Sequence, residues 1–248
     1  MKTHLYFLTI AAILFTSCNS QPRQVTDSKS EAIRVDASYN GIADSAYITN
    51  LQPIKEATDS IMSQVIGYAP EAMVRVRPES NLINWSADAL LAIARKITGQ
   101  QVDAAVVNVG GLRCDIAQGD VTIGSMYSLM PFDNELVILT MQGSDILDLC
   151  NTFAIRGGEG VSGIRMTING NKAENITING KAIVPEAVYY IATSDYLSTG
   201  TDEMVAFTRA IDKLITNKTI RELYIDFIKE NKVMQAVVDG RMKKITAQ

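Results

Sequence analysis

Four short motifs hold the residues whose types and spacing suit ligand-binding chemistry. In chain order they are Glu79-Ser80-Asn81-Leu82, Asn108-Val109-Gly110-Gly111-Leu112-Arg113, Met130-Pro131-Phe132-Asp133-Asn134, and Thr193-Ser194-Asp195-Tyr196-Leu197 running to Gly200-Thr201-Asp202. The pair Gly110-Gly111 permits tight backbone geometry, or lets a ligand approach main-chain N–H groups closely. Arg113 can present a planar guanidinium to phosphate or ribose oxygens, although a surface ion pair is the simpler role for one arginine. The glycines match neither GxGxxG nor GxxxxGK[ST], which argues against a Rossmann or P-loop site.

The distribution of histidine and cysteine excludes several catalytic classes. The only histidine is His4, inside an apolar N-terminal segment that we expect to be removed. Without it there is no Ser-His-Asp triad, no Cys-His pair and no imidazole ligand for a dinuclear phosphoesterase site. Cys114 and Cys150 are either buried thiols or a pair, and the absence of CxxC argues against zinc. We therefore expect no metal and no cofactor in this chain.

The N-terminal residues predict export. An apolar run from Leu5 to Phe15 follows Lys2 and is too short to span a bilayer, which is typical of a signal peptide over 1–17. The segment then resembles a bacterial lipobox ending at Cys18, whose thiol would be lipidated. Ordinary cleavage remains the alternative and leads to the same compartment. We expect an exported lipoprotein of the cell envelope, facing the periplasm or in the outer membrane, with a tether over 18–32.

Hydrophobic spacing and turn residues predict the elements that must position the motifs. One helix is expected over 51–65, with Pro53 in its first turn and Gly67 as its stop, and another over 82–98, ending at Gly99. Downstream the pattern predicts strands over 104–109, 136–141 and 188–193. A helix through Phe153 should follow Gly143-Ser144, which would serve as turn and N-cap. Hairpin turns are expected at Asn169-Gly170 and Asn179-Gly180, and a last helix should begin with a capping box at Thr219 and Glu222.

These elements indicate one domain over 33–248 of the α/β (α+β) class, with mixed sheets layered with helices. The net charge of −4 and the lack of a basic stripe argue against a nucleic-acid partner, because phosphate backbones recruit basic surfaces.

In this order and spacing, the four motifs are together similar to the C-terminal domain of the 5'-nucleotidase family. That family shows an E-x-N-x-x-N stretch entering a helix, a strand ending N-G-G-G-x-R, a P-F-x-N turn and an N-[FY]-x-x-x-G-G-D-G loop. The resemblance extends from about Arg34 to Ile245. Three positions depart from the family glycines, at Val109, Thr201 and Glu203, so the backbone there has fewer accessible conformations.

The resemblance implies a nucleoside pocket. In the family a base lies between two aromatic rings, and Phe132 and Tyr196 stand at the matching positions, with tyrosine where phenylalanine is common. A further family arginine precedes the E-x-N stretch, and Arg75 and Arg77 are both candidates for it. By the same resemblance, Asn108 would contact the base, Arg113 the ribose or phosphate, and Asp202 the ribose hydroxyls, next to Gly110 and Gly111 of the same turn.

The resemblance also implies what this chain would need from elsewhere. Full-length enzymes of the family carry an N-terminal metallophosphatase domain whose Asp, Asn and His ligands hold two metals. This sequence contains no D-x-H and no G-N-H-[DE]. We expect half of a split 5'-nucleotidase that binds a nucleotide or nucleoside, is inactive alone, and acts in nucleotide catabolism with a separate metallophosphatase that holds the divalent metals. The alternatives are a non-catalytic nucleoside- or nucleotide-binding lipoprotein and an interaction domain whose pocket has decayed.

Overall fold

The computed structural model describes residues 25–34, 36 and 45–245. The predicted signal peptide and the candidate lipidation site Cys18 lie outside these ranges. Close contacts divide the chain into two units, residues 1–50 and 51–248. In the first, residues 25–34 have no helix or strand and are exposed. Within the described ranges, no helix is both long and apolar enough to cross a bilayer.

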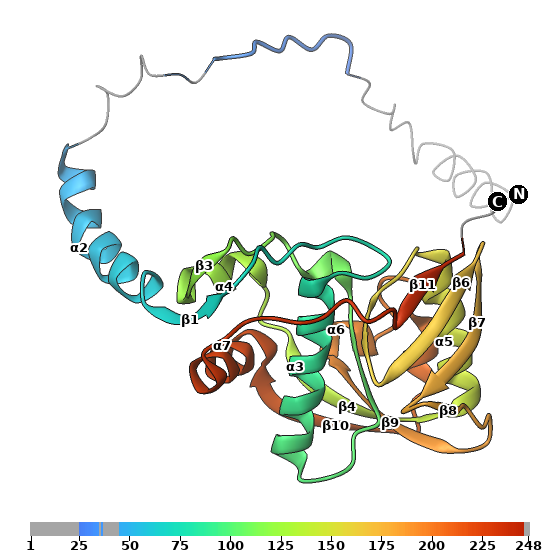
Figure 1. The fold of residues 1–248 in the computed structure, drawn as a ribbon. Coiled ribbons are helices and arrows are strands. Elements are labelled where there is room, and N and C mark those ends of the chain that lie inside the picture. The colour runs from blue at the N-terminus through green and yellow to red at the C-terminus, as the bar shows by residue number, and fades with distance from the viewer. Residues whose placement is uncertain (1–24, 35, 37–44, 246–248) are drawn as a thin grey trace, which may run out of the picture. The chain divides into compact units, whose positions relative to one another are not determined.

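A five-stranded mixed sheet forms the centre of the second unit (Figure 1). The strands β2 and β9 are parallel, and every other neighbouring pair is antiparallel. In spatial order the strands are β10 (Asp212–Thr219), β4 (Glu135–Gln142), β9 (Val188–Ser194), β2 (Ala104–Val107) and β5 (Gly160–Ser162). The predicted α/β class with mixed sheets is therefore confirmed.

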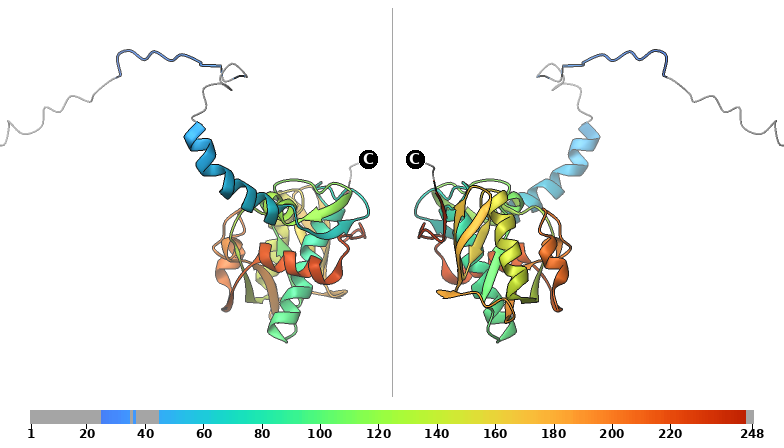
Figure 2. Two further views of the ribbon diagram at one scale, coloured as in Figure 1. Left: turned by 90° about the vertical axis from the view of Figure 1, so that its left-hand side faces the viewer. Right: turned by 90° about the vertical axis from the view of Figure 1, so that its right-hand side faces the viewer.

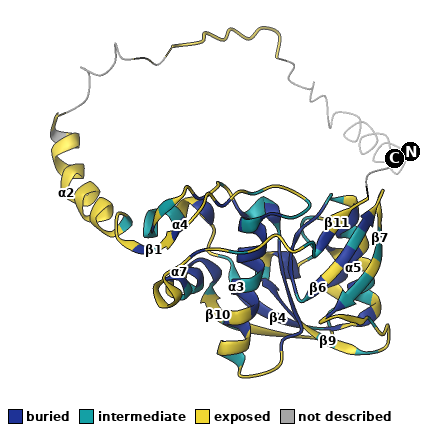
Figure 3. Ribbon diagram, in the orientation of Figure 1, coloured by how far each residue is buried: buried dark blue, intermediate teal, exposed yellow. Residues whose placement is uncertain are grey.

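Side chains that alternate along the central strands bury both faces of this sheet. In β4, Leu136 and Ile138 belong to one core cluster, whereas Val137 and Leu139 belong to the other. The first face is covered by α3 (Asn81–Thr98) and α7 (Ile220–Asn231), which contact each other (Figures 1 and 2). The second face is covered by α5 (Gly143–Ile155). Figure 3 shows the central strands and the inner sides of these helices as buried.

A second sheet lies beyond α5, and the right-hand view of Figure 2 looks toward it. It consists, in spatial order, of β11 (Met242–Lys244), β6 (Ile164–Asn169), β7 (Lys172–Ile178) and β8 (Lys181–Ala182). Both predicted hairpins are present. At the second turn Asn179 and Gly180 have φ values of 49° and 76°, the left-handed pair that an Asn-Gly hairpin favours.

Two further elements contact α7: β1 (Val65–Ala69), which pairs with β3 (Gly119–Thr122), and α4 (Ile123–Leu129). The short α6 (Asp195–Ser198) packs against β4 and β9, and α2 (Ser45–Met62), most of whose described residues are exposed, precedes β1. The predicted helix over 82–98 is confirmed almost to the residue, because Gly99 ends α3 with φ 62°.

Three sequence predictions of element ends are wrong. The first helix begins at Ser45, so Pro53 lies inside α2 rather than in its first turn, and α2 ends at Met62 before Gly67. Gly67 instead lies in β1, where a Cβ would come within 2.4 Å of Ile228 Cγ2. Gly143 is the first residue of α5 and not part of a preceding turn. Glycine fits there because a Cβ would lie 2.1 Å from the Val184 carbonyl oxygen.

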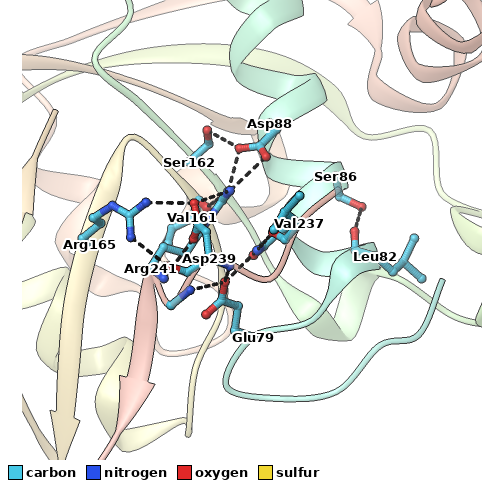
Figure 4. A network of polar contacts seen from close by, with 12 residues as sticks. Glu79, Leu82, Ser86, Asp88, Val161, Ser162, Arg165, Val237, Asp239 and Arg241 are labelled. Carbon is cyan, nitrogen blue, oxygen red and sulfur yellow. Dashed lines mark hydrogen bonds and ion pairs between the residues drawn. The ribbon is translucent and has the colours of Figure 1, made fainter. Parts of the chain in front are cut away.

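Residues 239–241 link the two sheets to α3 through a polar network (Figure 4). The Arg241 guanidinium donates to both carboxylate oxygens of Asp88 on α3 and to the Val161 carbonyl on β5. The Glu79 carboxylate accepts the main-chain N–H groups of Asp239 and Gly240. This network holds β11 beside β6.

Candidate functional site

A cleft of about 700 Å³ opens at one edge of the central sheet. Because β2 and β9 are parallel, their carboxyl ends meet at this edge, and antiparallel β4 begins there. Three of the motifs follow or precede those strand ends, so chain segments far apart in sequence converge. The structure brings together all seven predicted binding residues as lining of the cleft: Asn108, Gly110, Gly111, Arg113, Phe132, Tyr196 and Asp202.

Two aromatic rings from separate loops are presented to the cleft. Phe132 is 47% exposed and Tyr196 is 43% exposed, so neither ring is consumed by core packing. The Asp195 carboxylate accepts hydrogen bonds from the Asn134 side chain and the Glu135 main chain, both at 3.1 Å. This contact fixes the turn that carries Phe132 against the helix that carries Tyr196.

The buried side chain of Arg221, on α7, stabilises the turn that carries Phe132. Arg221 donates to the carbonyl oxygens of Met130 and Phe132, both at 3.1 Å, and pairs with Asp133. Its guanidinium also lies over the Tyr127 ring, 4.1 Å from the centroid. Arg221 therefore fixes the main chain on both sides of Pro131.

Asp202 is the polar focus of the cleft. Its carboxylate accepts the Asn108 side-chain amide at 2.8 Å and the Tyr196 hydroxyl at 3.3 Å, and the Arg156 guanidinium lies 3.5 Å away. Gly200, Asp202 and Glu203 all have positive φ, at 84°, 54° and 64°. The loop thus keeps a left-handed course at Glu203, although a side chain replaces the glycine expected there.

The turn after β2 brings main chain close to the cleft. A Cβ on Gly111 would lie 2.7 Å from the Asn108 amide oxygen, so glycine lets this side chain fold over the turn. Val109 is buried in the core, and its main-chain N–H donates to the Glu159 carboxylate at 2.6 Å. Substituting valine for the first family glycine therefore adds core packing without blocking the cleft. Arg113 donates to the Gly110 carbonyl, and its guanidinium lies 5.7 Å from the Phe132 centroid.

Arg75 and Arg77, the two candidates for the family arginine, lie before α3 and form hydrogen bonds with neighbouring loops. Arg75 donates to the Leu112 carbonyl, and its main-chain N–H donates to Asp115. Arg77 donates to the Gly158 carbonyl and to the Glu159 carboxylate, both at 2.6 Å. Neither is among the described residues that line the cleft, and which of them matches the family arginine stays open.

Sequence reasoning missed two charged residues at this site. Arg156 lines the cleft, and Glu159 lies buried behind it, where its carboxylate accepts the Arg156 Nε–H at 2.7 Å. The sequence did hold a signal, because two charged residues flank Gly157-Gly158 directly after a helix.

The two described cysteines lie in environments that disfavour the thiolate. Burial raises the pKa of Cys150 to about 12, and burial, then the Asp115 charge, raises the pKa of Cys114. Both are free thiols.

Fold and site together define an α/β domain with a cleft that combines two exposed rings, a carboxylate and arginines at the edge of a mixed sheet. The chain matches the family described as 5'-nucleotidase, C-terminal domain, over residues 65–209, and it belongs to that family.

Relatives with this domain are much longer. The trifunctional nucleotide phosphoesterase protein YfkN of Bacillus subtilis is 28% identical over 219 residues, covering 79% of this chain and 15% of that protein. The cell wall protein Lmo0130 of Listeria monocytogenes is 27% identical, covering 75% of this chain and 27% of its own length. The crystal structure of a 5'-nucleotidase precursor from Thermus thermophilus superposes with a TM-score of 0.72 and 26% identity, over 82% of this chain and 43% of that one. This chain thus spans less than half of each.

Proposed function

We propose that the cleft binds a nucleotide or nucleoside and supplies the substrate pocket for phosphate-ester hydrolysis in nucleotide catabolism. The observation that carries this proposal is the convergence of Phe132, Tyr196 and Asp202 on one cleft. A base stacks between the two exposed rings, each contact contributing about 1–3 kcal/mol. The ribose hydroxyls donate to Asp202, and Arg113 carries a positive charge on the same cleft for a phosphate.

The hydrolytic step is assigned to a separate metallophosphatase. With one histidine, at position 4, these 248 residues contain no set of imidazole ligands for a two-metal site. In this proposal a metallophosphatase outside these residues supplies the metals and the attacking water, and this chain positions the nucleoside. The names of the relatives, among them a nucleotide phosphoesterase and a 5'-nucleotidase precursor, support this assignment.

The proposed location is the cell envelope. The apolar run before Cys18 supports export with a lipid anchor, and the relative named as a cell wall protein is consistent with an envelope location. Incorporation of labelled palmitate into the wild type but not into Cys18→Ala would support the anchor. Equal labelling of both proteins, or of neither, would contradict it.

Isothermal titration of residues 45–248 with AMP, adenosine, UMP and a UDP-sugar tests the pocket. We expect Tyr196→Ala to weaken binding by about fivefold to 150-fold, since it removes a stacking contact of about 1–3 kcal/mol. Asp202→Ala should weaken binding by about tenfold or more, since it removes hydrogen bonds to a charged group. Matched controls are Tyr190→Ala and Asp120→Ala, two exposed residues outside the cleft lining, which should leave affinity unchanged.

Phosphatase assays then distinguish the substrate pocket of a split nucleotidase from a non-catalytic nucleoside-binding pocket. Purified chain should be inactive, and adding the cognate metallophosphatase should give activity that Tyr196→Ala lowers. Nucleoside binding without any such partner in cells would make the chain a binding lipoprotein. No binding by any of the four ligands would refute the pocket itself.

A further inference from the structure

A fully buried carboxylate lies behind the turn that contributes Asn108 to the cleft. The Glu159 side chain is 0% exposed, and each of its oxygens is used. One oxygen accepts Arg77 Nη2 at 2.6 Å and Arg156 Nε at 2.7 Å, and the other accepts the Val109 N–H at 2.6 Å. Glu159 thus joins the segment before α3, the end of α5 and the turn after β2.

The arginine between Glu159 and the cleft faces two carboxylates. Arg156 ends α5 and directs its Nε to Glu159, while its Nη2 lies 3.5 Å from Asp202 Oδ2. Partial burial opposes the charge on this guanidinium, but its hydrogen bond to Glu159 and the nearby acidic groups outweigh this and raise the pKa of Arg156. With Arg77, the four groups carry two positive and two negative charges, so each needs the others to be compensated.

We propose that Glu159 is a positioning residue for nucleoside recognition, acting through Arg156 on Asp202 and through the Val109 N–H on the turn that carries Asn108. This inference rests on the proposed nucleotide-binding function. Glu159 touches no ligand. It holds Arg156 at the angle from which the guanidinium contacts Asp202, and Asp202 in turn accepts Asn108 at 2.8 Å. The carboxylate offered to the ribose is therefore oriented from both sides.

A purely structural ion pair of similar geometry exists elsewhere in the fold and provides the control. Asp88 pairs with Arg241 in the network of Figure 4, at 2.6 and 3.0 Å, outside the cleft lining. Asp88→Asn should lower thermal stability as Glu159→Gln does, because both remove a charge from a partly or fully buried pair. Only the Glu159 variant should change the cleft.

The experiment compares Glu159→Gln with Asp88→Asn in two assays on the folded domain. In the first, the ¹³C resonance of the Asp202 carboxyl and the Nε–H resonance of Arg156 are recorded without ligand. We expect Glu159→Gln to shift the Asp202 carboxyl resonance and to shift or abolish the Arg156 Nε–H resonance. Asp88→Asn should change neither resonance. In the second, AMP and adenosine affinities are measured by titration.

For affinity we expect Glu159→Gln to raise the Kd about tenfold, which corresponds to losing one charge-assisted hydrogen bond. In an Asp202→Asn background the same substitution should raise the Kd clearly less than tenfold, because the route through Arg156 is already lost and only the route through the Val109 N–H remains. A tenfold loss in both backgrounds, or no loss in either, would overturn the proposal.

The two assays separate this inference from the function on which it rests. If no nucleotide or nucleoside binds the wild type, the proposed function fails, and the resonances alone decide the positioning role. An Asp202 carboxyl resonance that Glu159→Gln leaves unmoved would overturn the inference whether or not ligands bind.

Discussion

Replacing Arg221 should destabilise the domain and loosen the Phe132 turn. Its side chain is 7% exposed, and it makes two hydrogen bonds to main-chain carbonyls, one ion pair and one ring contact. Arg209 offers a matched comparison, since it pairs with Asp145 and Asp148 but is 44% exposed. Arg221 is buried and bonds main-chain carbonyls, whereas Arg209 is exposed and bonds carboxylates only, so the pair tests whether burial of the arginine and its partners sets the free-energy cost.

The magnitude follows from the groups left behind. Arg221→Met leaves the Met130 and Phe132 carbonyls without a hydrogen-bond donor, which costs about 1–1.5 kcal/mol each. It also removes a cation–π contact of about 1 kcal/mol. The exposed Asp133 adds little. We therefore expect a loss of about 3 kcal/mol, or a Tm lower by roughly 6–12 °C for a domain of this size. Arg209→Met should cost less than about 1 kcal/mol, because exposed pairs are screened.

Urea unfolding of the two variants, followed by circular dichroism, measures both losses of stability. Titration with adenosine measures how the loosened Phe132 turn affects affinity. Arg221→Met should also weaken nucleoside binding about fivefold, since the Phe132 ring loses part of its stacking energy. Arg221→Lys should fall between, as it keeps the charge without the planar fork. Equal stability losses for Arg209→Met and Arg221→Met would refute the reasoning from burial.

Two further predictions concern the backbone and the thiols. Gly157→Ala should lower the free energy of unfolding by about 1 kcal/mol, because φ is 78° but a Cβ meets nothing within 4 Å. Gly158→Ala should lower it by about 3 kcal/mol, because φ is 116° and a Cβ would lie 2.5 Å from Pro78 Cα. Equal losses in urea unfolding would contradict the clash. The pKa of Cys150 is raised from 9.0 to about 12, so the folded state keeps the thiol proton that the unfolded state loses. Stability should therefore be fully present below pH 9 and fall by up to about 1.4 kcal/mol per pH unit above it. Unfolding at pH 8, 9 and 10 should show a smaller fall for Cys150→Ala, and identical slopes would exclude this thiol as the cause.

Local signals in the sequence sufficed for much of the fold. The apolar face of α3 and its glycine stop, the two Asn-Gly hairpins and the apolar runs of β4 and β9 are each encoded within a few neighbouring residues. The cleft residues came from family resemblance, since each motif alone was weak. Their convergence depends on strand order, which spacing along the chain does not specify.

The misassigned glycines and the missed Glu159 involve partners distant in sequence. Gly67 and Gly143 are glycines because Ile228 and the Val184 carbonyl approach them, and not because the chain turns there. Glu159 is important because Arg77, 82 positions earlier, reaches it. A single sequence reports local preference, so roles set by tertiary approach were not predictable from it.

The network that joins Arg241 to Asp88 has a consequence for how the chain folds. These residues are 153 positions apart, and β11 pairs with β6 only when residues 242–244 are available. A ribosome or translocation channel that releases the chain from its N-terminus therefore exposes α3 and the open edge of β6 for as long as the intervening residues take to emerge. Contacts of such long range form late. An unpaired strand edge in a partly folded chain invites aggregation and is the kind of surface that chaperones protect.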